Sequence, residues 1–116
     1  MVVEIQFIEG VKELSLPRIK LTKSKNGETG TATFIFINPK LLFKNKLETI
    51  TGMSLLSNNK KIITTDINII FHNGRPFLIK AILVFKNSKE WFDFLYFMSY
   101  YSKETGLSFS EKNSSF

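Results

Sequence analysis

The chain of 116 residues contains no cysteine and a single histidine. Without cysteine it can form no disulfide, no thiolate metal site and no cysteine nucleophile. No apolar run approaches the ~20 residues that a helix needs to span a bilayer, and the first residues alternate like a strand instead of forming a signal peptide. A chain of this length can bury a core without metal or disulfide staples. We therefore expect one domain over residues 1–112, a flexible tail at 113–116 and no targeting segment.

Residues that could perform chemistry are also scarce. His72 stands beside the Asn73-Gly74 pair, with no second histidine or cysteine near it, which favours a structural or solvent-exposed side chain over a metal ligand. Glu90 and Asp93 lie one helical turn apart at the start of a predicted helix, where compensation of the helix dipole explains them. No serine or threonine stands in a nucleophile-elbow or phosphate-loop pattern. The sequence predicts a protein that is not an enzyme and has no cofactor, metal or small-molecule substrate.

Positive charge is concentrated in the first half of the chain. The whole chain has a formal net charge of +6, and the segment from Lys12 to Lys46, with eight basic and two acidic residues, accounts for a net +6 by itself. Such a segment attracts phosphates, anionic lipid or an acidic protein surface, and mainly speeds encounter and fixes orientation. A solvated face that keeps the protein soluble is the alternative, and abundant Asn, Lys, Ile and Phe indicate that codon bias adds to the excess.

The segment from Arg18 to Phe36 is predicted to form a β-hairpin. Asn26-Gly27 and Gly30 tolerate positive φ and lie between two runs of strand-forming residues. The two-residue period of a strand places Arg18, Lys20 and Thr22 on one face.

The charge of this hairpin continues into its turn through Lys23 and Lys25. On the returning strand, Ala32, Phe34 and Phe36 share an apolar face that can join a core. The hairpin is therefore expected to present cations outward and to bury its aromatic residues.

The remaining pattern predicts an α+β fold. We expect an antiparallel β-sheet meander of about four to five strands, with a long C-terminal helix packed on it and a short helix after the first hairpin. Besides the hairpin, the expected elements are strands at 2–8, 49–56, 62–71 and 77–85, and a short helix at 40–48, for which Pro39 is well placed as the first helical residue.

The long helix has start and stop signals. Asn87 and Glu90 form a capping-box arrangement and Gly106 can close the far end. The predicted buried stripe consists of Trp91, Phe94, Leu95, Met98 and Tyr101. Four further aromatic residues fall outside it and indicate either a second buried side, which we favour for most of them, or a partner surface: Phe92, Tyr96, Phe97 and Tyr100. After the helix, Leu107 and Phe109 alternate with polar residues, which is typical of a segment that can be added to a sheet as a strand.

Several segments together resemble one family over nearly the full length. They are PRIKLTKSKNGETGTATFIF from Pro17, ETITGM ending at Met53, NGRP at Asn73, NSKEW at Asn87, FMSYY at Phe97 and GLSFSEK at Gly106. The chain resembles the Psb twenty-eight family of photosystem II assembly proteins, formerly the thirteen-kilodalton reaction-centre protein of cyanobacteria and plastids. It departs from the family pattern mainly between Leu41 and Leu47, where the family has more acidic and small residues.

The resemblance implies a non-catalytic factor that binds transiently to immature photosystem II. Its partners would be the inner chlorophyll antenna subunit and the loops of the reaction-centre subunits, and it would protect the acceptor side during assembly. Its location would be peripheral on the stromal face of the plastid thylakoid, or on the cytoplasmic face in a cyanobacterium. Neither pigment nor metal is expected in the protein itself.

A physical route for this role starts from the hairpin and the tail. The candidate partner-binding residues are Lys20, Thr22, Lys23, Lys25, Gly27 and Gly30 in the hairpin and Leu107, Phe109 and Lys112 in the tail. Cations would position the protein on acidic loops and an added strand would hold it there.

Two alternatives are open on the residues alone. A basic RNA-binding module would use Phe34 and Phe36 to stack bases, although KSKNGETGTATF lacks the adjacent glycine–aromatic pattern of the common RNA motif. The resemblance instead implies that no nucleic acid is bound. Attachment to anionic lipid through the basic half would be auxiliary at most, because no long basic amphipathic helix is present.

Overall fold

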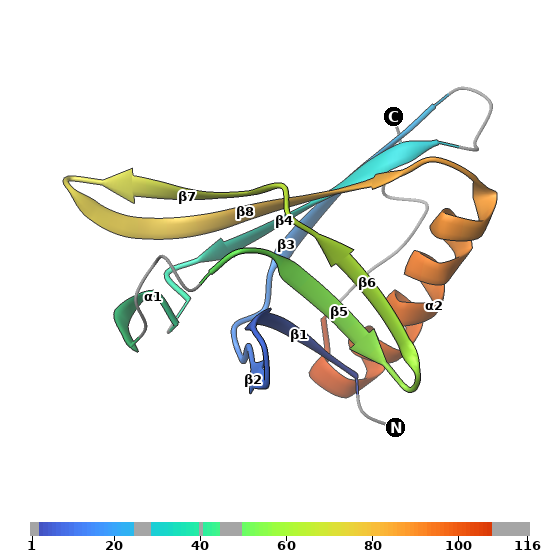
Figure 1. The fold of residues 1–116 in the computed structure, drawn as a ribbon, viewed down its shortest axis with the longest axis horizontal. Coiled ribbons are helices and arrows are strands. Elements are labelled where there is room, and N and C mark those ends of the chain that lie inside the picture. The colour runs from blue at the N-terminus through green and yellow to red at the C-terminus, as the bar shows by residue number, and fades with distance from the viewer. Residues whose placement is uncertain (1–2, 25–28, 40, 45–49, 108–116) are drawn as a thin grey trace.

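The computed structural model describes residues 3–24, 29–39, 41–44 and 50–107. Within these ranges the chain forms eight strands and two helices (Figure 1). In chain order they are β1 (Val3–Ile8), β2 (Val11–Lys12), β3 (Arg18–Lys23), β4 (Gly30–Ile37), α1 (Leu41–Lys44), β5 (Met53–Ser57), β6 (Lys60–Thr64), β7 (Ile67–His72), β8 (Arg75–Phe85) and α2 (Ser88–Thr105).

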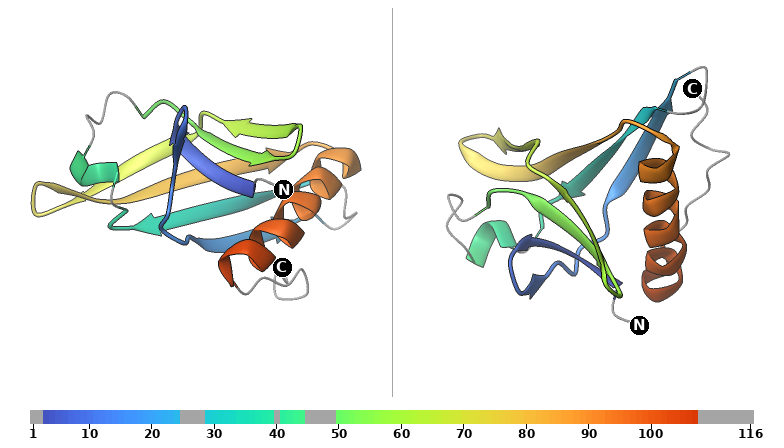
Figure 2. Two further views of the ribbon diagram at one scale, coloured as in Figure 1. Left: turned by 90° about the horizontal axis from the view of Figure 1, so that it is seen from below. Right: turned by 45° about the vertical axis from the view of Figure 1, so that its right-hand side comes forward.

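The strands form two antiparallel sheets. The first has the order β2-β1-β5-β6 and the second the order β3-β4-β8-β7. The sheets diverge, and α2 stands at the side where they are apart, so that it contacts both of them (Figure 1 and Figure 2). The α+β class predicted from the sequence is confirmed. The expectation of a single meander of four to five strands is corrected to two sheets of four strands each.

The predicted long strand at 62–71 is in fact two strands in different sheets. β6 pairs with β5 in the first sheet, and β7 pairs with β8 in the second. At the crossing between them, Thr64 Oγ1 donates a hydrogen bond to the carbonyl oxygen of Ile82 (2.6 Å), and Ile82 N–H donates to the carbonyl oxygen of Asp66 (2.9 Å). These bonds to β8 replace ladder bonds where the chain changes sheet. The isoleucine spacing runs through both halves and therefore hides the break.

Two short elements follow from local geometry. β2 was not predicted; it pairs with β1 through a turn in which Gly10 has φ 82°, a value that favours glycine. α1 is a single helical turn after Pro39, inside the range predicted for a short helix, and Leu41 and Leu42 are buried in the core. Residues 40 and 45–49 of that range lie outside the described residues.

The core lies between the inner faces of the two sheets and is closed by α2. On β4, Ala32, Phe34 and Phe36 are fully buried, as the sequence predicts. The ring centroid of Phe36 is 5.0 Å from that of Phe7 in the first sheet, and the ring centroid of Phe34 is 6.0 Å from that of Phe94 on α2. Aromatic contacts therefore join all three layers.

The buried arc of α2 is wider than the predicted stripe. Leu95 is half-buried, whereas Phe97, placed outside the stripe, is 1% exposed. Phe92 is 64% exposed, and Tyr96 and Tyr100 are half-buried. A helix that contacts two diverging sheets buries residues on two sides, which brings Phe97 into the core. Neither this helix nor α1, the two helices of the described ranges, is long and apolar enough to cross a membrane.

Candidate interaction surface

A basic row lies on the outer face of the second sheet, the face that points away from the first sheet and α2. Arg18, Lys20 and Thr22 on β3 are all exposed there. Their neighbours on β4 are Ile35, Thr33 and Thr31. The hydroxyl groups of Thr22 and Thr31 share a hydrogen bond, so the strand pair is joined by side chains as well as by backbone. The predicted gathering of cations on one strand face is confirmed for these residues.

Lys80 extends this row from a distant part of the sequence. It lies opposite Ile35 on β8, and Ile35 lies opposite Arg18 on β3, so the two cations flank one β4 residue on the same face. With strands about 4.8 Å apart, their backbones are separated by roughly 10 Å. The binding residues proposed from the sequence did not include Lys80, although alternation along the predicted strand at 77–85 places it on the face opposite to Ile79 and Ala81. The missing information was the β4–β8 pairing.

Lys23 lies on the other face of β3. Its ammonium group is 4.8 Å from the centre of the Trp91 ring on α2, a cation–π distance. Because strand residues alternate, Lys23 shares the inward side with Ile19 and Leu21, and not with Lys20. The structure therefore brings Lys20 and Thr22 together and separates Lys23 from them.

The hairpin leaves no space for a side chain at Gly30, the first residue of β4. A Cβ atom at Gly30 would fall well inside contact distance of the Thr22 carbonyl oxygen, so only glycine fits this close approach of β4 to β3. Ser24 N–H donates to the Thr29 carbonyl oxygen (2.8 Å), which closes the described part of the turn. The other two turn residues proposed for partner binding, Lys25 and Gly27, lie outside the described residues.

The C-terminal candidates are described only at their first residue. Leu107 is half-buried and packs against the core, and its N–H donates to Thr105 Oγ1 (3.3 Å). Gly106 ends α2 in the left-handed conformation (φ 79°) with its N–H bonded to the Ser102 carbonyl oxygen. Phe109 and Lys112 lie outside the described residues, so the predicted added strand stays a prediction.

The structure removes the basis for stacking RNA bases on β4. Phe34 and Phe36 have 0% exposure and contact other rings of the core. Moreover, the outward positions of β3 and β4 carry no aromatic side chain; the exposed aromatic residue of this sheet is Phe71 near the end of β7, which pairs with Pro76 and is 53% exposed. His72 is exposed at the turn between β7 and β8, with its ring 5.7 Å from Phe77. No cluster of three potential metal ligands occurs among the described residues.

A half-open groove of about 470 Å³ lies between β6, β8 and the first turns of α2. Three carboxylate residues, Asp66, Glu90 and Asp93, line it together with Lys61. Glu90 Oε1 accepts a hydrogen bond from Lys86 N–H (2.7 Å), while its own N–H donates to Asn87 Oδ1 (3.0 Å). These bonds form the predicted helix cap, so Glu90 stabilises the helix start.

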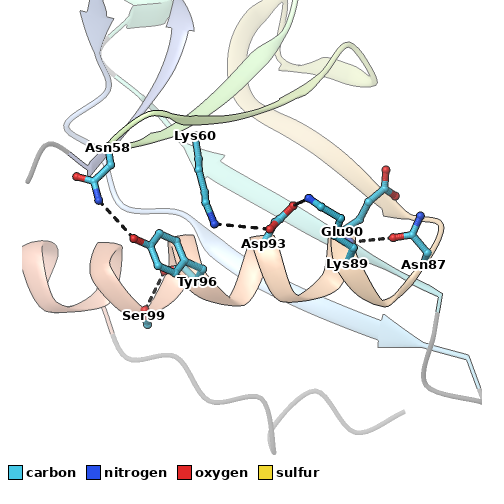
Figure 3. Close-up of polar contacts among 8 residues, drawn as sticks. All are labelled: Asn58, Lys60, Asn87, Lys89, Glu90, Asp93, Tyr96 and Ser99. Atoms are coloured by element: carbon cyan, nitrogen blue, oxygen red, sulfur yellow. Dashed lines mark hydrogen bonds and ion pairs between the residues drawn. The ribbon is translucent and has the colours of Figure 1, made fainter.

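Asp93 is held by lysines, as Figure 3 shows. Its carboxylate lies 2.8 Å from Lys89 Nζ and 3.9 Å from Lys60 Nζ. The hydrogen bond to Asp93 raises the pKa of Lys89 above its usual value. Beside this cluster, Asn58 donates to the Tyr96 hydroxyl (3.3 Å), which joins the β5–β6 turn to α2. Glu90 and Asp93 thus both take part in contacts that hold α2 in place.

Comparison with known proteins finds that this chain is similar to the members of one family. A sequence model of a family described as "Psb28 protein" matches residues 5–109. The "Photosystem II reaction center Psb28 protein" of Trichormus variabilis is 45% identical over 108 residues, which cover 93% of this chain and 97% of the relative. The proteins of the same name from Guillardia theta (43% over 113 residues; 96% and 97%) and Pyropia yezoensis (44% over 112 residues; 95% and 97%) are similar over the same extent.

Proposed function

The chain belongs to the Psb28 family, and on that premise we propose that it is a photosystem II protein of the thylakoid. The observation that carries the proposal is similarity at about 45% identity over nearly the whole of both chains, to proteins named for the photosystem II reaction centre. Such similarity leaves no room for an additional domain of different function within the aligned region.

At a finer level, we propose that the protein is a non-catalytic assembly factor. It binds transiently to immature photosystem II from the stromal or cytoplasmic side, on the inner chlorophyll antenna subunit and the loops of the reaction-centre subunits. Two of the three groove carboxylates, Glu90 and Asp93, support a non-catalytic role, since they are engaged in contacts that cap or position α2. The basic row of Arg18, Lys20 and Lys80 supports attachment to acidic loops.

The binding residues proposed from the sequence are retained in part. Lys20 and Thr22 occupy the exposed outer face, which suits direct contact with a partner. Lys23 covers Trp91, so its contribution would be to the fold of the hairpin. Lys25, Gly27, Phe109 and Lys112 stay proposals, with the tail from Leu107 onward as the strand that would hold the complex.

A capture experiment tests the proposed function. Tagged protein is incubated with detergent-solubilised thylakoids of its source, and the bound fraction is probed for the antenna and reaction-centre subunits. We expect photosystem II assembly intermediates to be captured and mature complexes to be absent. Recovery of mature complexes in the same amount would contradict an assembly role, and recovery of no photosystem II subunit would contradict the function itself.

The tail is tested in the same experiment by a chain that ends at Gly106. If an added strand supplies several backbone hydrogen bonds at about 0.5–1.5 kcal/mol each, its removal should weaken capture more than loss of one exposed cation does. The matched comparison is Lys20→Ala in the full-length chain. Equal capture by the truncated and full-length proteins would move the binding site entirely to the sheet.

A further inference from the structure

We infer that the outer face of the second sheet is a docking surface for an acidic protein surface with an apolar centre. The inference rests on the proposed function and adds the part of the molecule that makes the contact. Six aliphatic side chains lie on this face: Ile35, Ile37, Ile70, Leu78, Ile82 and Val84.

The pattern of β4 and β8 is unusual for a sheet with one face in water. An antiparallel sheet with one buried face ordinarily alternates apolar and polar residues. Here the inward residues Phe36, Ile79 and Leu83 are buried, and β8 also carries the aliphatic residues Leu78 and Ile82 on its outward face. Near-continuous apolar runs are typical of strands covered on both faces. No helix or strand of the described ranges lies over this face (Figure 1 and Figure 2).

The apolar residues form a connected patch. Ile37, Leu78 and Ile70 lie side by side across β4, β8 and β7. Ile37 is 42% exposed and Ile70 is 43% exposed. From the strand spacing and the rise per residue, the whole face measures roughly 300 Å². It would therefore form the centre of an interface of ordinary size, which buries about 800 Å² on each partner, and clustered exposure of this kind marks interaction sites.

The charges on the face select the partner. Arg18 and Lys20 lie beside the aliphatic patch and Lys80 lies within it, between Leu78 and Ile82; none of the paired strand positions of this face is acidic. An acidic partner surface would be attracted and oriented by these cations. A second copy of the chain would bring the same three cations against them, which disfavours self-association through this face.

Two other kinds of partner fit less well. A single-stranded nucleic acid is bound by a row of aromatic side chains on which successive bases stack, and the outward positions of β3, β4 and β8 offer none. A bilayer favours side chains that protrude into the headgroup region. Ile35, Leu78 and Ile82 are only half-exposed, so the centre of the face lacks the protruding side chains that a bilayer favours and suits a protein surface better.

The test uses glutamate substitutions of matched exposure in the full-length protein. Ile70→Glu places a negative charge in the patch, and Val11→Glu does the same at a residue of the first sheet that is 46% exposed. Ile70→Lys removes the same aliphatic side chain but keeps the sign of the surrounding charge. Thermal unfolding establishes that each variant folds, and Ile37→Glu provides a second substitution in the patch.

We expect Ile70→Glu and Ile37→Glu to reduce capture of photosystem II subunits by about tenfold or more, with a smaller loss for Ile70→Lys and none for Val11→Glu. Capture by Ile70→Glu at the wild-type level would overturn the docking surface and leave the proposed function standing. Equal losses for Ile70→Glu and Ile70→Lys would overturn the acidic character of the partner. Failure of the wild type to capture any photosystem II subunit would overturn the function and, with it, this inference.

Two direct assays test the other possible partners of this face, which are a lipid bilayer and a second copy of the chain. Flotation with phosphatidylglycerol vesicles that Ile70→Glu abolishes would overturn a protein partner in favour of lipid. A concentration-dependent dimer in sedimentation that Ile70→Glu dissociates would overturn it in favour of a second copy. Wild-type protein that neither floats with vesicles nor dimerises, but captures photosystem II subunits through this face, is the expected result.

Discussion

Lys20 and Lys23 lie on one strand, but their surroundings are opposite. Lys20 is exposed on the outer face, whereas the ammonium group of Lys23 lies over the Trp91 ring. We predict that Lys23→Ala lowers the free energy of unfolding by about 0.5–1 kcal/mol and shifts the emission of the single tryptophan, while Lys20→Ala changes stability by less than about 0.5 kcal/mol. Urea unfolding followed by tryptophan fluorescence measures both. A larger destabilisation by Lys20→Ala would contradict these positions.

Tyr101 gives the protein a specific alkaline response. Burial raises its pKa to about 12, and the nearby Glu13 carboxylate contributes in the same direction. In the unfolded chain tyrosine ionises near pH 10. Between these values the unfolded state binds fewer protons than the folded state, so the free energy of unfolding falls as pH rises, by up to about 2 kcal/mol.

Urea unfolding between about pH 9 and pH 12 measures this loss. We predict that Tyr101→Phe removes most of the decline, because the ionising hydroxyl is gone. Tyr100→Phe is the matched control, since Tyr100 lies on the same helix but is only half-buried. The same decline in the wild type and in Tyr101→Phe would assign it to other groups, such as lysines that lose their charge in this range.

Which side chains share a face could be predicted from the sequence wherever strand alternation was applied consistently. It placed Phe34 and Phe36 in the core, and it would also have separated Lys23 from Lys20. The position of Lys80 could not be predicted from its local sequence, because its place beside Arg18 depends on β4 lying between β3 and β8. Strand order is set by packing between distant segments, which leaves no local pattern.

The long helix is an element whose ends are determined locally. Asn87 Oδ1 accepts a hydrogen bond from Glu90 N–H at the start of α2, as the capping-box pattern predicts. We predict that Asn87→Ala lowers the free energy of unfolding by about 1 kcal/mol. Asn87→Ser should retain most of the stability of the wild type, because the serine hydroxyl oxygen can also accept a hydrogen bond from the free amide. Chemical denaturation measures both, and equal destabilisation by Ala and Ser would show that the cap contributes nothing.

The strands show where prediction from the sequence stops. The turn at Asn73-Gly74, with both residues at positive φ, was predictable because a tight hairpin requires such residues. The division of 62–71 into β6 and β7 was not, because the chain changes sheet through bonds to Ile82, a residue far along the sequence. For the same reason a single meander was expected, although the class of the fold was correct.

On the scale of the whole molecule, the position of charge matters more than its total. The cations of the outer face act on a partner within about 10 Å at moderate ionic strength. We predict that replacing Arg18, Lys20 and Lys80 by glutamine weakens capture of photosystem II subunits and makes it less sensitive to salt. Replacing Lys12, Lys61 and Lys86, which are exposed elsewhere, is the matched control because each triple substitution lowers the net charge of +6 by three.

The measurement is the captured fraction of photosystem II subunits over a range of salt concentrations. Attraction between paired surfaces decays with salt only where the charges meet the partner. The outer-face triple variant should therefore show weak, nearly salt-independent capture, and the control should follow the wild-type salt curve with a small offset from net charge. If both triples flatten the curve equally, binding depends on net charge alone and the outer face has no special part in it.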